Sequence, residues 1–295
     1  MRQWMIWGCG IIAGLIWLWR ENNSLTNSIV TVKNRKIPME FSGFRIVQVS
    51  DLHNKKFGRG QRKLLKKIKA LQPDLVVITG DLIYAAHLKS LRSYCPMKNA
   101  ADFVKGVVNL APTVYVPGNH EGRTERYPEL LEILQRSGVR VLYEEAIPLE
   151  RADERIYLIG SGTADLEQQE RKGTCAVEKM IGAIRGAVDT TPESGYRILL
   201  AHHPEYFEEY CGTGAELVFA GHAHGGQIRI PGIGALFAPG QGTFPDYVSG
   251  FYKKDRTNMV VSRGLGRSLF PFRIFNRPEL VCVTLMNERM KDCVD

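Results

Sequence analysis

Several polar side chains stand in short fragments whose residue types are typical of metal sites. The fragments are Asp51-x-His53, Gly80-Asp81, Gly118-Asn119-His120-Glu121, His202 and His222-x-His224. Side chains at positions i and i+2 of an extended segment point the same way, so each D-x-H or H-x-H pair can reach one ion. Carboxylates, imidazoles and an amide suit Mn, Fe or Zn, and the set is large enough for two divalent ions. Two such ions can clamp a phosphoryl group and activate water.

The position of these fragments supports a shared site. Apolar runs at 44–50, 75–79 and 113–116 predict strands, and the strands lead into Asp51, Asp81 and Asn119. Open α/β sheets bind ligands at the carboxyl ends of their strands. Taken singly, each fragment has a plainer interpretation as a turn, a loop or a helix cap. Their order and common placement favour one metal site.

The rest of the chain predicts one α/β domain with mixed sheets flanked by helices. Helices are expected at about 64–71, 100–110, 128–137 and 176–188. Further strands are expected at 29–32, 139–143, 155–160, 196–201, 216–220, 226–230, 258–262 and 279–285. We place the domain at 41–287, after a tether and first strand at 21–40 and before a C-terminal tail at 288–295.

Residues 1–20 are expected to form a single-pass transmembrane anchor. Residues 4–19 carry no charge, but these 16 residues span roughly 24 Å as a helix, slightly short of a bilayer core of about 30 Å. All four tryptophans lie at the two ends of this run, like an aromatic belt. A cleaved signal peptide, a lipoprotein site at Cys9 and a buried core helix are the alternatives. The anchor predicts location at the cell membrane, with the side of the domain undecided.

Composition narrows the function only broadly. A formal net charge of +8 favours anionic partners, which include phosphorylated substrates, nucleic acid and anionic membranes. The six cysteines contain no C-x-x-C pair, which argues against a zinc ribbon or a thioredoxin-like site. Their scattered spacing does not predict a disulfide framework, although one bridge stays open.

The metal fragments resemble, in order, the five blocks of the calcineurin-like metallophosphoesterases, over roughly residues 40–286. The segments starting at His222 and Val261 are similar to the YkuE/YaeI-like bacterial branch, which contains membrane- or wall-associated phosphodiesterases. The resemblance implies a four-layer α/β/β/α sandwich. It also implies that a metal-bridging hydroxide attacks phosphorus in line.

Residue roles follow from the same resemblance. It implies that Asp51, His53 and His224 bind one metal, that Asn119, His202 and His222 bind the other, and that Asp81 bridges the two. His120 is then a catalytic residue that contacts phosphate and protonates the leaving oxygen.

Two positions depart from the family pattern. Tyr84 stands where relatives often carry an aspartate, which changes the support expected for His120. His203, next to His202, is a second candidate ligand. We choose His202 because Ala201-His202-x-Pro204 keeps the family's spacing.

We therefore expect a membrane-anchored hydrolase of a phosphodiester, pyrophosphate or phosphomonoester bond, acting on a phosphorylated small molecule or a lipid. Some relatives hydrolyse UDP-diacylglucosamine, which suggests a similar substrate. A nuclease or nucleotide phosphodiesterase is one alternative, although no nucleic-acid module or stacking-aromatic pattern is visible. A non-catalytic metal-binding membrane scaffold is another.

Two basic features are candidates for substrate or lipid contact. Arg263 and Arg267 lie in a glycine-rich loop where one of them can meet substrate phosphate. The basic run at 55–69 can face anionic lipid. A solvated surface is the alternative in both cases.

Overall fold

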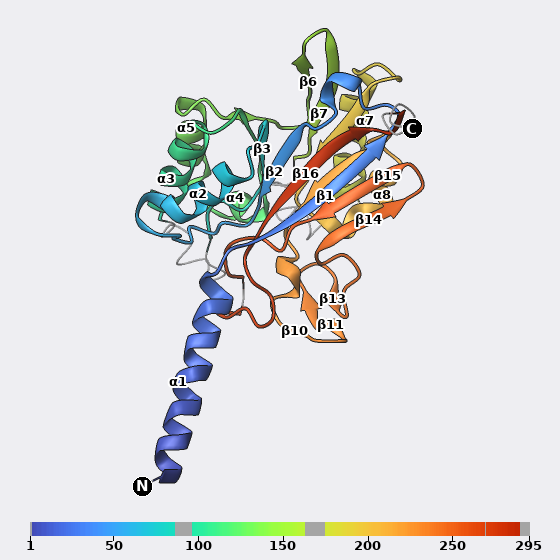
Figure 1. Cartoon of the computed structure of the whole chain (residues 1–295). Coiled ribbons are helices and arrows are strands. Elements are labelled where there is room, and N and C mark those ends of the chain that lie inside the picture. The colour runs from blue at the N-terminus through green and yellow to red at the C-terminus, as the bar shows by residue number, and fades with distance from the viewer. Residues whose placement is uncertain (1, 86–95, 163–174, 269, 290–295) are drawn as a thin grey trace.

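Two six-stranded sheets face each other at the centre of the molecule (Figure 1). The computed structural model describes residues 2–85, 96–162, 175–268 and 270–289. Most of the expected tail at 288–295 therefore lies outside the described residues. Helices cover the outer faces of both sheets, and a long N-terminal helix, α1 (Arg2–Asn23), projects away from the domain.

The first sheet combines strands from both ends of the chain. In spatial order it contains β1 (Thr26–Asn34), β16 (Glu279–Asn287), β2 (Arg45–Val49), β3 (Leu75–Thr79), β4 (Thr113–Val116) and β5 (Arg140–Val141). The last strand, β16, pairs in parallel with all of β1 and antiparallel with β2. The strand β1 lies within the segment 21–40, where a tether and first strand were expected, and it forms one edge of this sheet.

The second sheet comes mainly from the later half of the chain. Its spatial order is β14 (Gly250–Lys254), β15 (Thr257–Val261), β9 (Leu217–Ala220), β8 (Tyr196–Leu200), β7 (Glu154–Gly160) and β6 (Ala146–Arg151). The inner strands are parallel, and the strand at each edge is antiparallel to its neighbour. A mixed sheet of this kind agrees with the prediction from sequence.

Three apolar clusters hold the layers together. Successive residues of a strand face opposite sides, so Ile46 packs between the sheets whereas Val47 packs under helices. The helices on the first sheet are α2 (Arg62–Ala70), α3 (Lys98–Val107) and α5 (Tyr127–Arg136). Those on the second sheet are α7 (Cys175–Asp189) and α8 (Phe207–Cys211). The layer order is therefore helices, sheet, sheet, helices.

The predicted elements match the structure best where an apolar run is short and fully buried. β3 and β4 have the predicted bounds. The strand expected at 226–230 is reduced to β10 (Arg229–Ile230), because a 3-10 turn occupies His224–Gly226. Two ribbons, β10 with β11 (Gly234–Ala235) and β12 (Phe237–Ala238) with β13 (Gly242–Thr243), were not predicted.

The expected transmembrane span is not supported. Among the described residues, none of the helices combines the length and the apolar character that crossing a membrane requires. The segment does form a helix, but Arg2 lies at one end and Arg20 and Glu21 lie at the other. The uncharged run between these charges is shorter than a bilayer core.

Several polar contacts join the end of α1 to the domain. Glu21 and Asn22 are buried. Glu21 Oε1 lies 2.7 Å from Arg277 Nε, and the Asn22 side chain exchanges two hydrogen bonds with the Arg273 backbone. Lys55 Nζ also donates to the Asn22 carbonyl near the end of α1. The first residues of the expected 21–40 tether therefore fix the direction of α1.

The close packing between the sheets predicts that truncating a side chain in this layer lowers the free energy of unfolding. Leu200→Ala should lower the free energy of unfolding by about 2–5 kcal/mol, because Leu200 is fully buried between the sheets and its loss leaves a cavity. Ile29→Ala is the control, since Ile29 is 72% exposed on β1 and should change stability by less than about 0.5 kcal/mol. Urea denaturation monitored by circular dichroism measures both. Equal effects would contradict this assignment of the core.

Candidate metal centre

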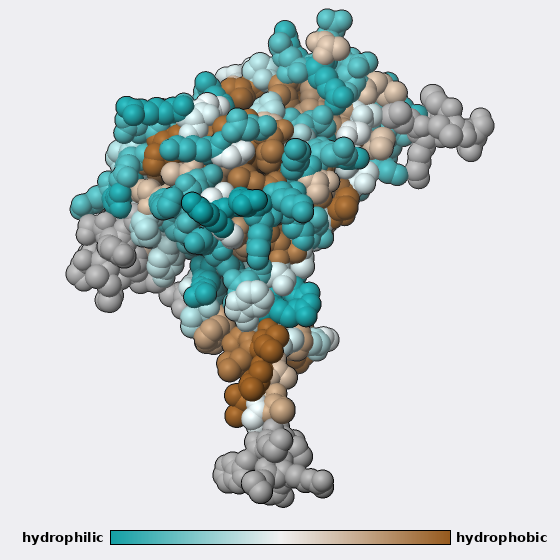
Figure 2. Space-filling model, turned by 60° about the vertical axis from the view of Figure 1, so that its left-hand side comes forward, coloured by the Kyte–Doolittle hydropathy of each residue, from teal (hydrophilic) through white to brown (hydrophobic). Residues whose placement is uncertain are grey.

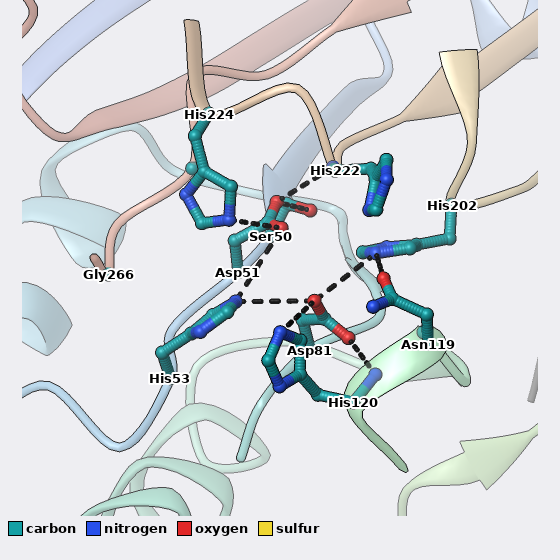
Figure 3. A network of polar contacts seen from close by, with 12 residues as sticks. Ser50, Asp51, His53, Asp81, Asn119, His120, His202, His222, His224 and Gly266 are labelled. Carbon is teal, nitrogen blue, oxygen red and sulfur yellow. Dashed lines mark hydrogen bonds and ion pairs between the residues drawn. The ribbon is translucent and has the colours of Figure 1, made fainter. Parts of the chain in front are cut away.

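The sequence fragments converge at one end of the two sheets. Asp51, Asp81 and Asn119 follow β2, β3 and β4, while His202 and His222 follow β8 and β9 of the facing sheet. Figure 3 shows their side chains gathered around two carboxylates, with His53 and His224 beside Asp51. All eight predicted metal and catalytic side chains are buried, each at 8% exposure or less.

The first carboxylate, Asp51, is fixed on one oxygen and open on the other. Its Oδ2 accepts hydrogen bonds from Ser50 Oγ at 2.5 Å and from the His222 backbone N–H at 3.2 Å. Its Oδ1 has no hydrogen-bond partner and faces His224 Nε2 at 3.3 Å and His53 Nε2 at 3.8 Å. Asp51, His53 and His224 thus form one group that can hold a metal ion.

The second carboxylate, Asp81, stands between imidazoles from both sheets. Its Oδ1 accepts the His120 backbone N–H at 2.9 Å. Its Oδ2 has no hydrogen-bond partner and lies 3.2 Å from His53 Nε2, 3.3 Å from His202 Nε2 and 3.9 Å from His120 Nε2. Asp81 therefore belongs to two candidate groups, one with His202 and His222 and one with His53 and His120.

The neighbouring histidines His202 and His203 point to different partners. His202 Nδ1 donates to the Thr79 carbonyl at 2.7 Å, which directs Nε2 toward Asp81 and to within 2.9 Å of Asn119 Oδ1. His203 Nδ1 lies 2.8 Å from Glu205 Oε1. An amide oxygen and an imidazole lone pair do not bond to each other. The contact between Asn119 and His202 therefore needs a proton on Nε2 or a cation bound by both atoms.

The distances fit a metal centre. Two ligands bound at about 2.1 Å to the same ion lie roughly 3.0–3.4 Å apart in octahedral or tetrahedral geometry. The closest approaches to Asp51 Oδ1 and Asp81 Oδ2 fall in this range. Buried carboxylate oxygens without a hydrogen bond are costly unless a cation compensates them. The residues present therefore fit two ions.

Charge coupling makes the two acids strongly acidic. Burial alone raises the pKa of Asp51, but the neighbouring His224 and His53 lower it to about 2. Burial likewise opposes the effect of His202 and His120 on Asp81, whose pKa lies well below its ordinary value. Both carboxylates are therefore ionised and are ready to bind cations at neutral pH.

The imidazoles divide into two classes in the absence of bound ions. Burial lowers the pKa of His53 and His202, but contacts with the carboxylates dominate and raise it to about 9 and about 10. Burial prevails at His222, His224 and His120; it lowers the pKa of His224 and His120 to about 3. Metal binding at His53 and His202 must displace protons.

The backbone is strained at most candidate ligands. Asp51, His53, Asp81, His222 and His224 all have positive φ, between 49° and 60°. Such conformations are uncommon for residues other than glycine and cluster at functional sites. Gly80 has φ +84°, and a Cβ there would lie 2.6 Å from the Gly118 backbone. The loops after β3 and β4 can therefore approach each other only with glycine at this position.

The sequence matches a family model described as calcineurin-like phosphoesterase over residues 44–226. The chain belongs to this family.

Three relatives extend the match over most of the chain. The metallophosphoesterase YkuE of Bacillus subtilis is 28% identical over an alignment that includes 86% of this chain and 83% of YkuE. Phosphodiesterase YaeI of Escherichia coli is 28% identical and covers 82% of each. UDP-2,3-diacylglucosamine pyrophosphatase LpxG of Chlamydia muridarum is 25% identical and covers 93% of this chain and 94% of its own.

Tyr84 replaces the expected aspartate with an aromatic support for His120. The two rings stack with centroids 4.9 Å apart and an interplanar angle of 27°. The His120 nitrogen that faces away from Asp81, Nδ1, lies 3.1 Å from both the amide nitrogen and the carbonyl oxygen of Ala85. The ring of this member of the calcineurin-like family is therefore positioned by stacking and by backbone contact.

The two candidate substrate arginines lie in different environments. Arg263 Nη2 is 2.9 Å from the buried Glu279 Oε1, and the Arg263 backbone N–H donates to Glu279 Oε2. Its guanidinium thus links the loop after β15 to β16. Of the two, Arg267 is the exposed one, and it lies in the loop whose Gly266 packs against His53.

Two supporting residues have roles that the sequence did not predict: Glu121 stood in a predicted fragment without a role, and Arg273 stood outside all of them. Glu121 accepts hydrogen bonds from the backbone N–H groups of Gly118 and Asp81 at 2.8 and 2.9 Å, so it ties the loops after β3 and β4 together. The signal for Glu121 was its place directly after His120. Arg273 is fully buried, with Nη2 3.4 Å from His224 Nδ1. No spacing rule points to Arg273, because only the fold brings it to the metal centre.

The contacts of His202 and His203 predict different metal affinities for two alanine variants. His202→Ala should lower the bound metal by about one ion per chain, because it removes a nitrogen that faces Asp81 and Asn119. His203→Ala should leave the metal content nearly unchanged, since His203 contacts Glu205 instead. Elemental analysis after loading with Mn²⁺ and gel filtration measures the content. The reverse pattern would show that His203 is the ligand.

A second prediction concerns the ion pair of Arg263. Arg263→Ala should lower the free energy of unfolding by about 1.5–3 kcal/mol, because Glu279 loses a charged hydrogen-bond donor inside the domain. Arg267→Ala is the matched control and should have little effect on stability, since Arg267 is exposed. Chemical denaturation compares the two. No loss of stability in Arg263→Ala would contradict its structural role.

Proposed function

We propose that this chain is a dinuclear metal phosphoesterase whose ligands are those expected from the sequence. Asp51, His53 and His224 would hold one ion. Asn119, His202 and His222 would hold the other, with Asp81 shared between them. The observation that carries the proposal is Asp81 Oδ2, which is buried without a hydrogen bond between His53 and His202 at 3.2 and 3.3 Å. Such an oxygen, facing ligand atoms on two sides, is suited to bridging.

Two divalent ions, when bound, supply Lewis acidity toward phosphoryl oxygens and lower the pKa of water. The surrounding chain holds this chemistry in place. Thr79 fixes the tautomer of His202, and Ser50 with the His222 backbone orients Asp51. Such supporting contacts fix the direction of each ligand and commonly affect metal affinity tenfold or more. Mn, Fe and Zn all suit this mixed set of oxygen and nitrogen ligands.

His120 is the proposed catalytic residue. Its Nε2 faces the centre, 3.9 Å from Asp81 Oδ2, while Tyr84 and Ala85 hold the rest of the ring. Burial lowers the pKa of His120 to about 3, so the ring is neutral before substrate arrives. A nearby phosphate anion favours the protonated form. His120 can then bind a phosphoryl oxygen and give its proton to the leaving oxygen.

The proposed substrate is a phosphodiester, pyrophosphate or phosphomonoester, with a lipid or a UDP-diacylglucosamine-like molecule favoured. Two relatives support this proposal through their own activities. YaeI is named a phosphodiesterase, and LpxG is named a UDP-2,3-diacylglucosamine pyrophosphatase. Both names describe a substrate that carries an organic group on each side of the bond that is cleaved. Arg267, exposed in the loop beside His53, is the candidate contact for the phosphate of such a substrate.

The proposal predicts metal-dependent turnover of bis-p-nitrophenyl phosphate. Chelation should abolish the activity, and Mn²⁺, Fe²⁺ or Zn²⁺ should restore it. His120→Ala should lower kcat by roughly 10²–10⁴-fold, because it removes proton transfer without removing a proposed ligand. Its metal content should equal that of the unaltered protein, and Tyr84→Phe, which keeps the stacked ring, should retain most activity. A protein that binds two ions but shows no turnover with any of these metals would instead be a scaffold.

A further inference from the structure

Exposed apolar side chains gather on the loops beyond the metal centre. They come from the β10–β13 ribbons and the loop before β16. We call them the aromatic surface: Ile233, Phe237, Phe244, Phe270, Phe272 and Phe275. Their exposure ranges from 41% at Phe270 to 70% at Phe244. Large side chains exposed together, rather than singly, mark a contact site for another molecule.

The aromatic surface is continuous with α1. The Trp17 and Phe275 rings meet edge to face, with centroids 5.1 Å apart. The ring centroids of Phe270 and Phe272 lie 6.1 Å apart. Figure 1 shows the β10, β11 and β13 ribbons on the same side of the domain as α1, and Figure 2 shows apolar atoms along α1 just beyond the domain. The contact between Trp17 and Phe275 therefore joins the apolar part of α1 to the aromatic surface.

The exposed part of α1 is apolar on all sides. Every residue from Cys9 to Trp17 is exposed, including Ile11, Ile12, Leu15 and Ile16. A protein partner that docks on a helix covers one stripe of it, whereas a helix that is apolar all round is suited to a lipid environment. The burial of Glu21 and Asn22 holds α1 at a fixed direction beside the aromatic surface.

The aromatic surface is also attached to a proposed metal ligand. Asn276 Nδ2 donates to the His224 carbonyl at 2.7 Å. The Phe270 backbone N–H donates to Gln227 Oε1, and Ile274 pairs with Gln227 and Arg229. A molecule that contacts these aromatic rings is therefore close to the metal centre.

Positive charges accompany the apolar region. Arg20 is exposed in the last turn of α1, and Lys56 is exposed next to Lys55, which donates to Asn22. Arg267 is exposed three residues before Phe270. Basic residues beside inserted aromatic and aliphatic side chains are typical of proteins that bind anionic bilayers at the interface.

We propose that the aromatic surface inserts, together with α1, into the interface of an anionic lipid bilayer. The metal centre then faces phosphoesters that are held in the bilayer by their acyl chains. The location of the protein at a bilayer does not depend on its catalytic activity. The class of substrate, amphiphilic phosphoesters, rests on the function proposed above.

Vesicle binding of the full-length protein tests the location. The probes are vesicles of phosphatidylcholine with and without phosphatidylglycerol. Phe237→Ser/Phe244→Ser and Phe270→Ser/Phe272→Ser should each weaken binding to the anionic vesicles roughly tenfold or more, because they remove inserted apolar area. The matched control is Ile29→Ser/Met39→Ser, which removes two exposed apolar side chains outside this surface and should bind normally. Binding should also weaken when phosphatidylglycerol is omitted.

A comparison of a soluble substrate with a lipid substrate tests whether the aromatic surface places the metal centre against the bilayer. Each double variant should hydrolyse soluble bis-p-nitrophenyl phosphate like the unaltered protein, but should lose roughly tenfold activity toward a phosphodiester lipid in the same vesicles. Loss of both activities without loss of metal would show damage to the centre and contradict the proposal. If the unaltered protein turns over neither substrate, the proposed function fails while the vesicle result still decides the location.

Two results would overturn the proposed location. One is unchanged vesicle binding in both aromatic variants. The other is a dimer of the unaltered protein that becomes monomeric in these variants, with equal vesicle binding, as measured by sedimentation. The second result would assign the aromatic surface to contact between copies of the chain.

Discussion

The negative charge of two buried carboxylates is the constraint around which this molecule is arranged. Asp51 and Asp81 lie at the ends of adjacent strands with almost no exposure to water. An isolated ionised carboxylate in such a place is strongly unfavourable, so each must be paired with donors and cations. The surrounding histidines, the Ser50 hydroxyl and backbone N–H groups supply part of that compensation. Bound divalent ions would supply the rest. Five of the seven proposed ligands have positive φ values, so the site also carries backbone strain.

Local sequence predicted the strands that carry the carboxylates because those strands are short, apolar and fully buried. β3 and β4 each end where the apolar run ends, directly before the loops that lead to Asp81 and Asn119. Two-residue strands such as β12 escaped prediction because turns and tertiary contacts define them. Local sequence does not show which sheet β1 joins, because the pairing of β1 with β16 links residues more than 250 positions apart.

Within the site, the types and spacing of residues predicted the proposed ligands but not the residues that support them. Whether an arginine is a substrate contact or a structural ion pair depends on distant partners. Arg263 reaches Glu279 only because β15 and β16 bring them together, and the sequence around Arg263 looks much like that around Arg267. The buried Arg273 illustrates the same limit, since it connects His224 to the end of α1 through a loop with no regular periodicity. A shift of α1 would therefore move Arg273 and, through it, the side chain of the proposed ligand His224.

The position of β16 also determines when this protein can fold. The final strand lies between β1 and β2, which are among the first parts of the domain to be synthesised. Until Glu279–Asn287 leaves the ribosome, β1 has no partner in the sheet and one edge of β2 is unpaired. Pairings between distant segments form slowly and leave strand edges open to aggregation in the meantime. The direction of α1 is likewise fixed only after Arg273 and Arg277 are synthesised, because these two residues are the partners of Asn22 and Glu21.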